Sequence, residues 1–383
     1  MKNTAVISFV VLLAACSGAD APVATPAPAP KLNPTVERPA ADDMSYDEKV
    51  LLAQGYIDAG NAVDAESVAR EAAAAEPTRP DAYALVGRAL LFQNKLAESA
   101  AHYEKARALG IKERRVFVEL ASVYDVSGAY DKAIDVYTAF LAEYPDDVEM
   151  RHQYGLTLLL NERYDEAVKA LAAAHKKAPG EAQLGQDYGY ALLRAQRVDE
   201  AATLLKKVVE AEPRRAEAHL YLGQAYAAQG DLQRAVTALD SAVALSKKDL
   251  RALRTRARLR ALVGDHEGAL TDYDLLLQAK KNDPSALLGK AGALLFLGRL
   301  DEAKGLIDAV HGAVGDNPLI DQRRAQLAWR SGDKKSVAVI EQLADAQPNN
   351  IELWRDLNLA AKKFKLRKIE RKAKGQLKKL GAD

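Results

Sequence analysis

The sequence is poor in several residue types, and each shortage excludes a class of protein. Its 383 residues include a single cysteine, Cys16, so neither a disulfide framework nor a cysteine metal site can form within the chain. The formal net charge is only +1, which gives no general reason to expect a nucleic-acid partner. Only six phenylalanines and two tryptophans are present, while hydrophobic residues, of which alanine is the most frequent, make up 49%. This composition predicts a helix-rich fold.

Catalytic signatures are also missing. The six histidines lie far apart, and none has a second ligand at the spacing that a zinc site such as HExxH requires. There is no glycine-rich phosphate loop and no GxSxG nucleophile turn. We therefore expect a non-catalytic protein with no metal, no cofactor and no small-molecule substrate.

The N-terminal residues have the pattern of an export signal. Lys2 precedes an apolar run from Ala5 to Ala15, which is too short to span a bilayer. The run ends in Leu13-Ala14-Ala15-Cys16, which resembles the lipobox of bacterial lipoproteins. The resemblance implies a signal peptide over residues 1–15 and a covalent lipid, including an acyl chain such as palmitate, on Cys16. Ser17, rather than aspartate, favours the outer membrane, with the protein facing the periplasm; the alternative is an ordinary signal peptide with a chance cysteine.

The composition of residues 16–45 predicts a tether, because the segment is rich in proline and alanine and has no periodic apolar pattern. At about 3.1 Å per residue in the polyproline conformation, the 28 residues from Ser17 to Met44 reach at most roughly 85 Å.

A 34-residue repeat fills the chain from residue 46 to residue 351. One complete copy is Ala216 to Asp249, in which small and apolar residues have helical spacing that is interrupted once, at Gly230-Asp231. This pattern predicts two short antiparallel helices. Position 8 of the repeat is glycine or alanine in all nine copies, and position 20 is small in all but the last. The nine copies begin at Tyr46, Pro80, Arg114, Val148, Ala182, Ala216, Leu250, Pro284 and Pro318.

The period, the small residues at positions 8 and 20 and the prolines at the junctions resemble the tetratricopeptide repeat. The resemblance implies an all-α, right-handed superhelical solenoid of nine helix-turn-helix units. Position 4, often tryptophan in that family, is mixed here. Residues 352–383 read as basic C-terminal capping helices, with eleven lysines and arginines against four acids, a net charge of +7. Contact with anionic lipid or an acidic partner is the alternative interpretation.

The resemblance also implies a concave groove, lined by positions 2, 5, 9, 12 and 13 of each first helix, that binds peptides. Its predicted residues here combine cations with aromatics: Arg251, Arg254, Arg258, Phe296, Gln322, Gln326, Trp329 and Arg330. Position 7, apolar in the first six repeats, becomes a basic ribbon of Arg256, Lys290 and Arg324. Both sets suit an acidic ligand. The alternative is that these cations pair with acids on neighbouring helices, Asp272 and Asp274 being candidates.

Together these features predict a lipid-anchored periplasmic scaffold that binds protein partners. In plan it is similar to the assembly lipoproteins of type IV and Tad (Flp) pili, which help a secretin form in the outer membrane. Two alternatives stay open: an adaptor for peptidoglycan hydrolases, and a scaffold for exopolysaccharide export.

Overall fold

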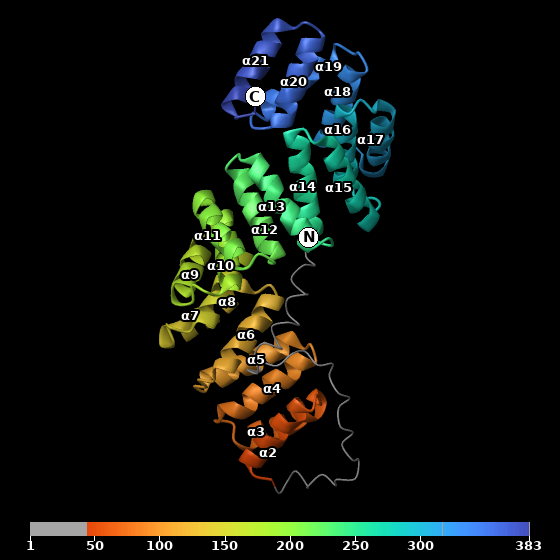
Figure 1. The fold of residues 1–383 in the computed structure, drawn as a ribbon. Helices are drawn as coiled ribbons and strands as arrows, with labels where there is room; N and C mark the ends of the chain where they lie inside the picture. The colour runs from red at the N-terminus through yellow and green to blue at the C-terminus, as the bar shows by residue number, and fades with distance from the viewer. Residues whose placement is uncertain (1–43, 316, 383) are drawn as a thin grey trace. The chain divides into compact units, whose positions relative to one another are not determined.

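The computed structural model describes residues 44–315 and 317–382, and over these residues the chain is helical, with no strand. It divides into two compact units, one ending at Pro179 and the other beginning at Gly180 (Figure 1). The predicted signal peptide, Cys16 and nearly all of the tether lie outside the described residues. None of the described helices is long and apolar enough to cross a membrane.

The helices come in consecutive pairs. In the first unit the pairs are Tyr46–Asp58 (α2) with Ala62–Ala75 (α3), Pro80–Phe92 (α4) with Leu96–Ala108 (α5), Arg114–Val126 (α6) with Tyr130–Glu143 (α7), and Val148–Leu160 (α8) with Tyr164–Lys177 (α9). In the second unit they are Ala182–Arg194 (α10) with Val198–Ala211 (α11), Ala216–Ala228 (α12) with Leu232–Leu245 (α13), Leu250–Val263 (α14) with His266–Ala279 (α15), Pro284–Phe296 (α16) with Leu300–Val314 (α17), Pro318–Arg330 (α18) with Ser336–Ala346 (α19), and Ile351–Lys363 (α20) with Arg367–Lys379 (α21).

The first helix of each of the nine predicted repeats starts at the first residue of that repeat. The prediction of an all-α solenoid of helix-turn-helix repeats is therefore confirmed. Proline opens three of these helices, α4, α16 and α18, where its missing N–H has no intrahelical partner to lose.

The small residue at position 8 allows the two helices of a repeat to pack closely. A Cβ atom on Gly189 would lie 2.5 Å from Cγ of Leu205, which is position 24 of the same repeat. Gly155 meets Leu171 in the same way, and Gly223 meets Leu239. These leucines are fully buried, so a larger residue at position 8 would have to displace a core side chain.

The turn between the two helices has one residue in the left-handed region, always at position 15. Six of the nine repeats have glycine there, including Gly230 with φ 82°. The others place Asn94, Glu162 and Gln196 in the same conformation, with φ between 58° and 60°. The left-handed conformation is costly for a residue with a Cβ atom and nearly free for glycine.

A pair of opposite substitutions in neighbouring repeats tests this turn. We expect Gln196→Gly to raise the free energy of unfolding by about 0.5–1 kcal/mol, and Gly230→Gln to lower it by a similar amount. Urea denaturation followed by far-UV circular dichroism measures both. A stabilised Gly230→Gln variant would contradict the assignment.

The side chain at position 4 of a repeat helps to join that repeat to the preceding one. In four repeats its side chain donates a hydrogen bond to the carbonyl of the junction proline six residues earlier. Tyr83 donates to Pro77 O over 3.3 Å, His219 Nε2 to Pro213 O over 3.0 Å, Trp354 Nε1 to Pro348 O over 3.0 Å, and Arg151 to Pro145 O. The mixed residues at this position therefore include several that can all serve as donors.

The C-terminal residues form a tenth helix pair. α20 begins at Ile351, one residue earlier than the 34-residue period predicts. Counted from Ile351, Lys365 is position 15 of this pair, and its φ of 59° is left-handed like that of the other turn residues. The pair packs on α18 and α19 through a cluster that contains both tryptophans of the chain, Trp329 and Trp354.

Candidate partner-binding groove

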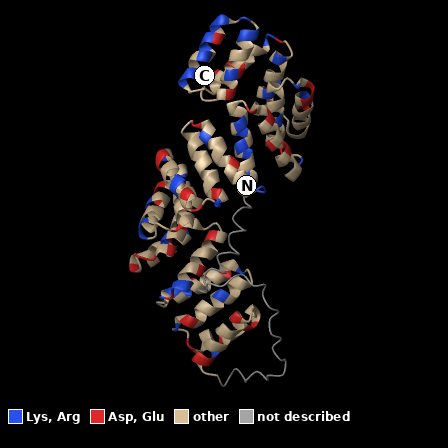
Figure 2. Ribbon diagram, in the orientation of Figure 1, with Lys and Arg blue, Asp and Glu red and all other residues tan. Residues whose placement is uncertain are grey.

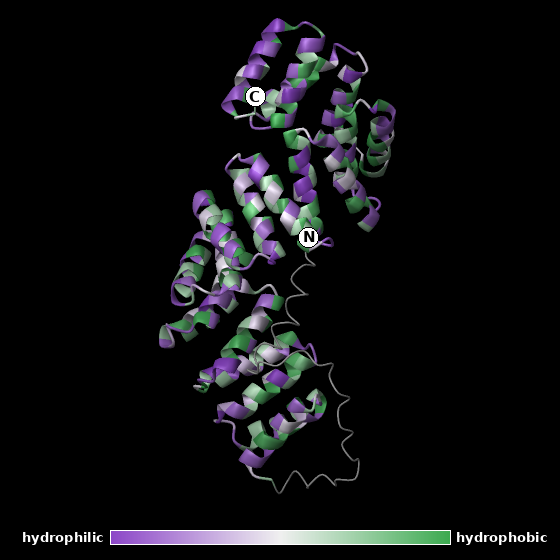
Figure 3. Cartoon of the chain, in the orientation of Figure 1, coloured by the Kyte–Doolittle hydropathy of each residue, from purple (hydrophilic) through white to green (hydrophobic). Residues whose placement is uncertain are grey.

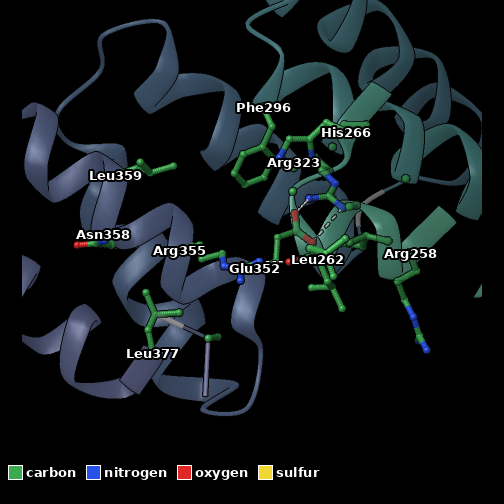
Figure 4. Close-up of a pocket in the computed structure, with 18 of the residues that line it drawn as sticks. Arg258, Leu262, His266, Phe296, Arg323, Glu352, Arg355, Asn358, Leu359 and Leu377 are labelled. Atoms are coloured by element: carbon green, nitrogen blue, oxygen red, sulfur yellow. Dashed lines mark hydrogen bonds and ion pairs between the residues drawn. The ribbon is translucent and has the colours of Figure 1, made fainter. Parts of the chain in front are cut away.

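A groove of about 1180 Å³ lies in the second unit (Figure 4). The first helices of four consecutive pairs, α14, α16, α18 and α20, line it, and the second helices α15 and α21 also contribute residues. Its floor includes small residues on α16, among them Ala286, Gly289 and Ala293. We call this cavity the groove.

A buried polar network under the groove joins three helix pairs. Arg323 on α18 lies across α16, where a Cβ atom on Gly292 would come within 2.7 Å of its guanidinium carbon. Its Nε donates to Leu288 O over 3.0 Å and its Nη1 to Gln326 Oε1 over 2.6 Å. It also forms an ion pair with Glu352 on α20. Glycine at position 292 is therefore needed to place this guanidinium.

Glu352 is held as a carboxylate by that network. Burial by itself would raise its pKa, but the charge and hydrogen bonds of Arg323 and the hydrogen bond from Gln326 outweigh burial, and the pKa lies below its ordinary value. The Gln326 bond spans 3.0 Å. The negative charge of Glu352 is thus already balanced by Arg323, and it does not neutralise the other cations of the groove.

Arg355 connects the two ends of the groove wall. It lies on α20 and donates a hydrogen bond to the carbonyl of Leu262, in the last turn of α14 (Figure 4). A cation at this end of a helix interacts favourably with the helix dipole. No carboxylate among the described residues forms an ion pair with Arg355, and burial lowers its pKa.

One wall of the groove is aromatic. The rings of Phe296 and His266 stack with centroids 4.5 Å apart and an interplanar angle of 12°. On Phe296 also lies Arg330, whose guanidinium carbon is 4.5 Å from the ring centroid and whose Nη1 is 2.5 Å from Asp356. Burial lowers the pKa of His266, which keeps the ring neutral at neutral pH.

The structure brings three of the eight predicted groove residues into the groove: Arg254, Arg258 and Phe296. Arg254 pairs with Asp283, the N-cap of α16, over 2.5 Å. Arg258 is exposed, extends away from Arg323 and Glu352 in Figure 4, and has no ion-pair partner among the described residues.

The other five predicted groove residues do not line it. Arg251 pairs with Asp249 at 3.0 Å and with Glu217 at 2.9 Å, outside the groove. The remaining four are buried or nearly so on α18, beneath the surface: Gln322, Gln326, Trp329 and Arg330.

The basic ribbon lies among acids. Arg256 forms ion pairs with Asp272 at 2.6 Å and Asp240 at 2.9 Å, and Lys290 forms one with Asp274 at 2.6 Å. These contacts join α14 and α16 to neighbouring second helices, as in the alternative interpretation of this ribbon. Arg324 is partly buried on α18.

The sequence patterns did not identify Arg323, Glu352 and Arg355. Arg323 occupies position 6, which is not among the expected groove positions. Glu352 and Arg355 lie beyond the ninth repeat, in the segment interpreted as a cap. If a tenth repeat is started at Ile351, Trp354 falls at position 4, where the family often has tryptophan. This tryptophan is the sequence feature that could have revealed the tenth repeat.

The groove therefore has more unpaired positive charge than unpaired negative charge. Arg258, Arg355 and Lys378 contribute positive charge without an ion pair to any described carboxylate, whereas Glu352 is balanced. Apolar side chains lie beside them, including Leu359, which is 43% exposed. This combination can hold an extended or helical segment that carries both carboxylates and apolar side chains. The described residues contain no cluster of metal-ligating groups.

Comparison with known proteins supports the architecture. Two sequence models of the tetratricopeptide repeat match the chain, one at residues 50–113, 118–182 and 188–249 and the other at 284–309, together more than half of it. No functionally curated protein has significant sequence similarity to the chain.

Two solved structures illustrate the structural similarity. The C-terminal part of a TPR repeat-containing protein from Cytophaga hutchinsonii is 16% identical with a TM-score of 0.52, over 63% of this chain and 98% of that one. PilW, described as a widely conserved type IV pilus biogenesis factor, is 19% identical with a TM-score of 0.50, over 54% of this chain and 96% of that one. The chain therefore belongs to the tetratricopeptide repeat family, and its repeats form a scaffold for protein–protein interaction.

Proposed function

We propose that this protein is a non-catalytic scaffold that binds an acidic segment of a protein partner in the groove of its second unit. The observation that carries the proposal is the set of uncompensated cations, Arg258, Arg355 and Lys378, beside an apolar floor. The carboxylates of such a segment would neutralise these cations, while its apolar side chains would cover Leu359 and the alanines of α16.

We further propose that this scaffold assists assembly of a pilus or secretin system from the periplasmic face of the outer membrane, anchored by lipid at Cys16. Two observations support this setting. The N-terminal sequence resembles a lipoprotein signal, and PilW, with a similar fold, is a type IV pilus biogenesis factor.

Site-specific cross-linking in cells tests the proposal. A photoreactive amino acid at Leu359, in the groove, is expected to capture a secretin or another pilus-assembly protein. The matched control is Leu275 on α15, which is 41% exposed but does not line the groove, and it should not capture that protein. Capture of a cell-wall hydrolase or an export-porin subunit at Leu359 would overturn the pilus assignment, and the same product at both positions would overturn the groove.

A further inference from the structure

The last helix pair carries a second surface, distinct from the groove. Of the eleven basic residues after Ile351, four are held by other groups: Arg355 by a carbonyl, Lys363 by the carbonyls of Trp329 and Arg330, Lys372 by Glu341 and Asp345, and Lys374 by Glu370. Most of the others are exposed and have no ion pair with a described residue. Six of these do not line the groove; Lys362 lies on α20, and the other five, which lie on α21 or just before it, we call the terminal basic face: Lys365, Arg367, Lys368, Arg371 and Lys379.

At one position the last repeat differs in its pairing from earlier repeats. In earlier repeats the arginine that precedes the second helix forms an ion pair three residues on, as Arg163 does with Glu166 at 2.7 Å and Arg299 with Glu302 at 2.7 Å. Arg367, the first residue of α21, and Glu370 have the same spacing. Glu370 instead contacts Lys374 at 2.7 Å, which leaves the Arg367 guanidinium exposed to solvent.

The terminal basic face also concentrates charge that the rest of the chain lacks. Residues 352–383 have a net charge of +7 in a chain whose total is +1, so residues 1–351 have a net charge of −6. Lys and Arg cover much of α21 in Figure 2, and the helix is hydrophilic over most of its length in Figure 3. A local field of one sign attracts an anionic surface even when the whole chain is nearly neutral.

The arrangement of the terminal basic face suits binding to a membrane surface better than binding to a peptide. Its cations lie on the outer side of a terminal helix rather than in a cavity, and none of its five residues is aromatic. The apolar residues of α21 already pack on the hydrophobic cluster of the last helix pairs, Ala373 and Leu377 fully buried and Ile369 partly buried, so they are not available for insertion into a bilayer. What remains is a set of long, exposed cations without a shaped pocket, which suits lipid head groups that can rearrange beneath it.

We propose that the terminal basic face binds the head groups of anionic phospholipids and so gives the protein an electrostatic membrane contact. This contact would act in addition to any lipid at Cys16. It does not depend on what occupies the groove.

Vesicle sedimentation tests the proposal. The full chain carrying Cys16→Ser, which prevents lipid attachment, is mixed with vesicles of phosphatidylglycerol and phosphatidylethanolamine in equal parts. We expect binding that weakens as salt is added and that is absent on phosphatidylcholine vesicles. Since each basic residue near such a surface contributes about fivefold, the variant K365Q/K368Q/R371Q/K379Q should bind at least about tenfold more weakly.

The chain provides a matched control. The variant K247Q/K248Q/K280Q/K281Q removes the same charge from exposed residues of the same unit that have no described ion pair, and it should bind like the unaltered chain. An equal loss in both variants would overturn the proposal, as would tighter binding to polyglutamate than to the vesicles. Unchanged tryptophan fluorescence shows that the last helix pair is still folded. Arg258→Glu should leave vesicle binding intact, so failure of this proposal is separate from failure of the groove proposal.

Discussion

Replacing Asp356 by alanine is expected to lower the free energy of unfolding of the C-terminal helices α18 to α21 by about 3–5 kcal/mol. Asp356 is completely buried, and its carboxylate is 2.5 Å from Nη1 of Arg330, whose side chain is 8% exposed. The variant leaves the Arg330 guanidinium buried without its counter-charge. Breaking one partner of such a pair costs much more than the pair contributes, because the remaining charge is not solvated.

The two tryptophans make this effect measurable in one region. Trp329 and Trp354 are the only tryptophans of the chain, and both belong to the hydrophobic cluster around the last two helix pairs. Urea unfolding followed by their fluorescence therefore reports on these helices. The control is Asp308→Ala, which removes an exposed partner of Lys304 and should change the free energy by less than about 0.5 kcal/mol. Equal shifts in both variants would contradict the buried pair.

Asp356→Ala should also change how the free energy of unfolding depends on pH. Burial raises the pKa of Asp356 to about 6, against the opposing charge of Arg330. A raised carboxyl pKa favours the folded protein at low pH, and this contribution is lost as pH rises through the folded pKa. Between about pH 5 and pH 7 the unaltered protein should lose roughly 1 kcal/mol more stability than Asp356→Ala, which has no carboxyl to titrate. The comparison cancels His266, which titrates nearby in both proteins.

Much of the fold could be predicted because each repeat obeys local rules. The period fixes where helices begin, and glycine at position 8 marks where Leu205 and its counterparts must fit. Glycine at position 15 marks the left-handed turn, although Gln196 shows that the fold can impose that conformation on another residue. These requirements repeat along the chain, so nine copies make the pattern unambiguous.

The site was harder to predict because charge pairing depends on neighbours that are distant in sequence. Arg256 and Arg258 are two residues apart, yet Arg258 lines the groove without a described ion pair, whereas Arg256 is neutralised by Asp272 and Asp240. Arg355 donates a hydrogen bond to Leu262, a residue three repeats earlier, and no sequence period indicates that contact. Periodicity assigns a face to each residue, but it does not indicate which cations keep an unpaired charge.

Reversing the charge of Arg258 is expected to weaken partner binding at least tenfold, or about 1.4 kcal/mol. Arg258 is the clearest probe of the groove, because it is exposed and has no described ion pair to break. Arg254 is a poorer choice, since its substitution would also disturb Asp283, which caps α16. Glutamate at position 258 would place a negative charge where the partner's carboxylate binds, replacing attraction with repulsion.

The measurement uses a synthetic peptide with the partner sequence that cross-links at Leu359, titrated against the full chain by fluorescence anisotropy. Arg214→Glu is the matched control, because Arg214 is an exposed arginine of the same unit, outside the groove and without a described ion pair. Arg258→Lys should retain most of the affinity, since it keeps the charge, and added salt should narrow the difference between Arg258→Glu and the unaltered chain. If Arg258→Glu and Arg214→Glu bind equally well, the partner does not use the cationic edge of the groove, and the apolar floor alone must account for recognition.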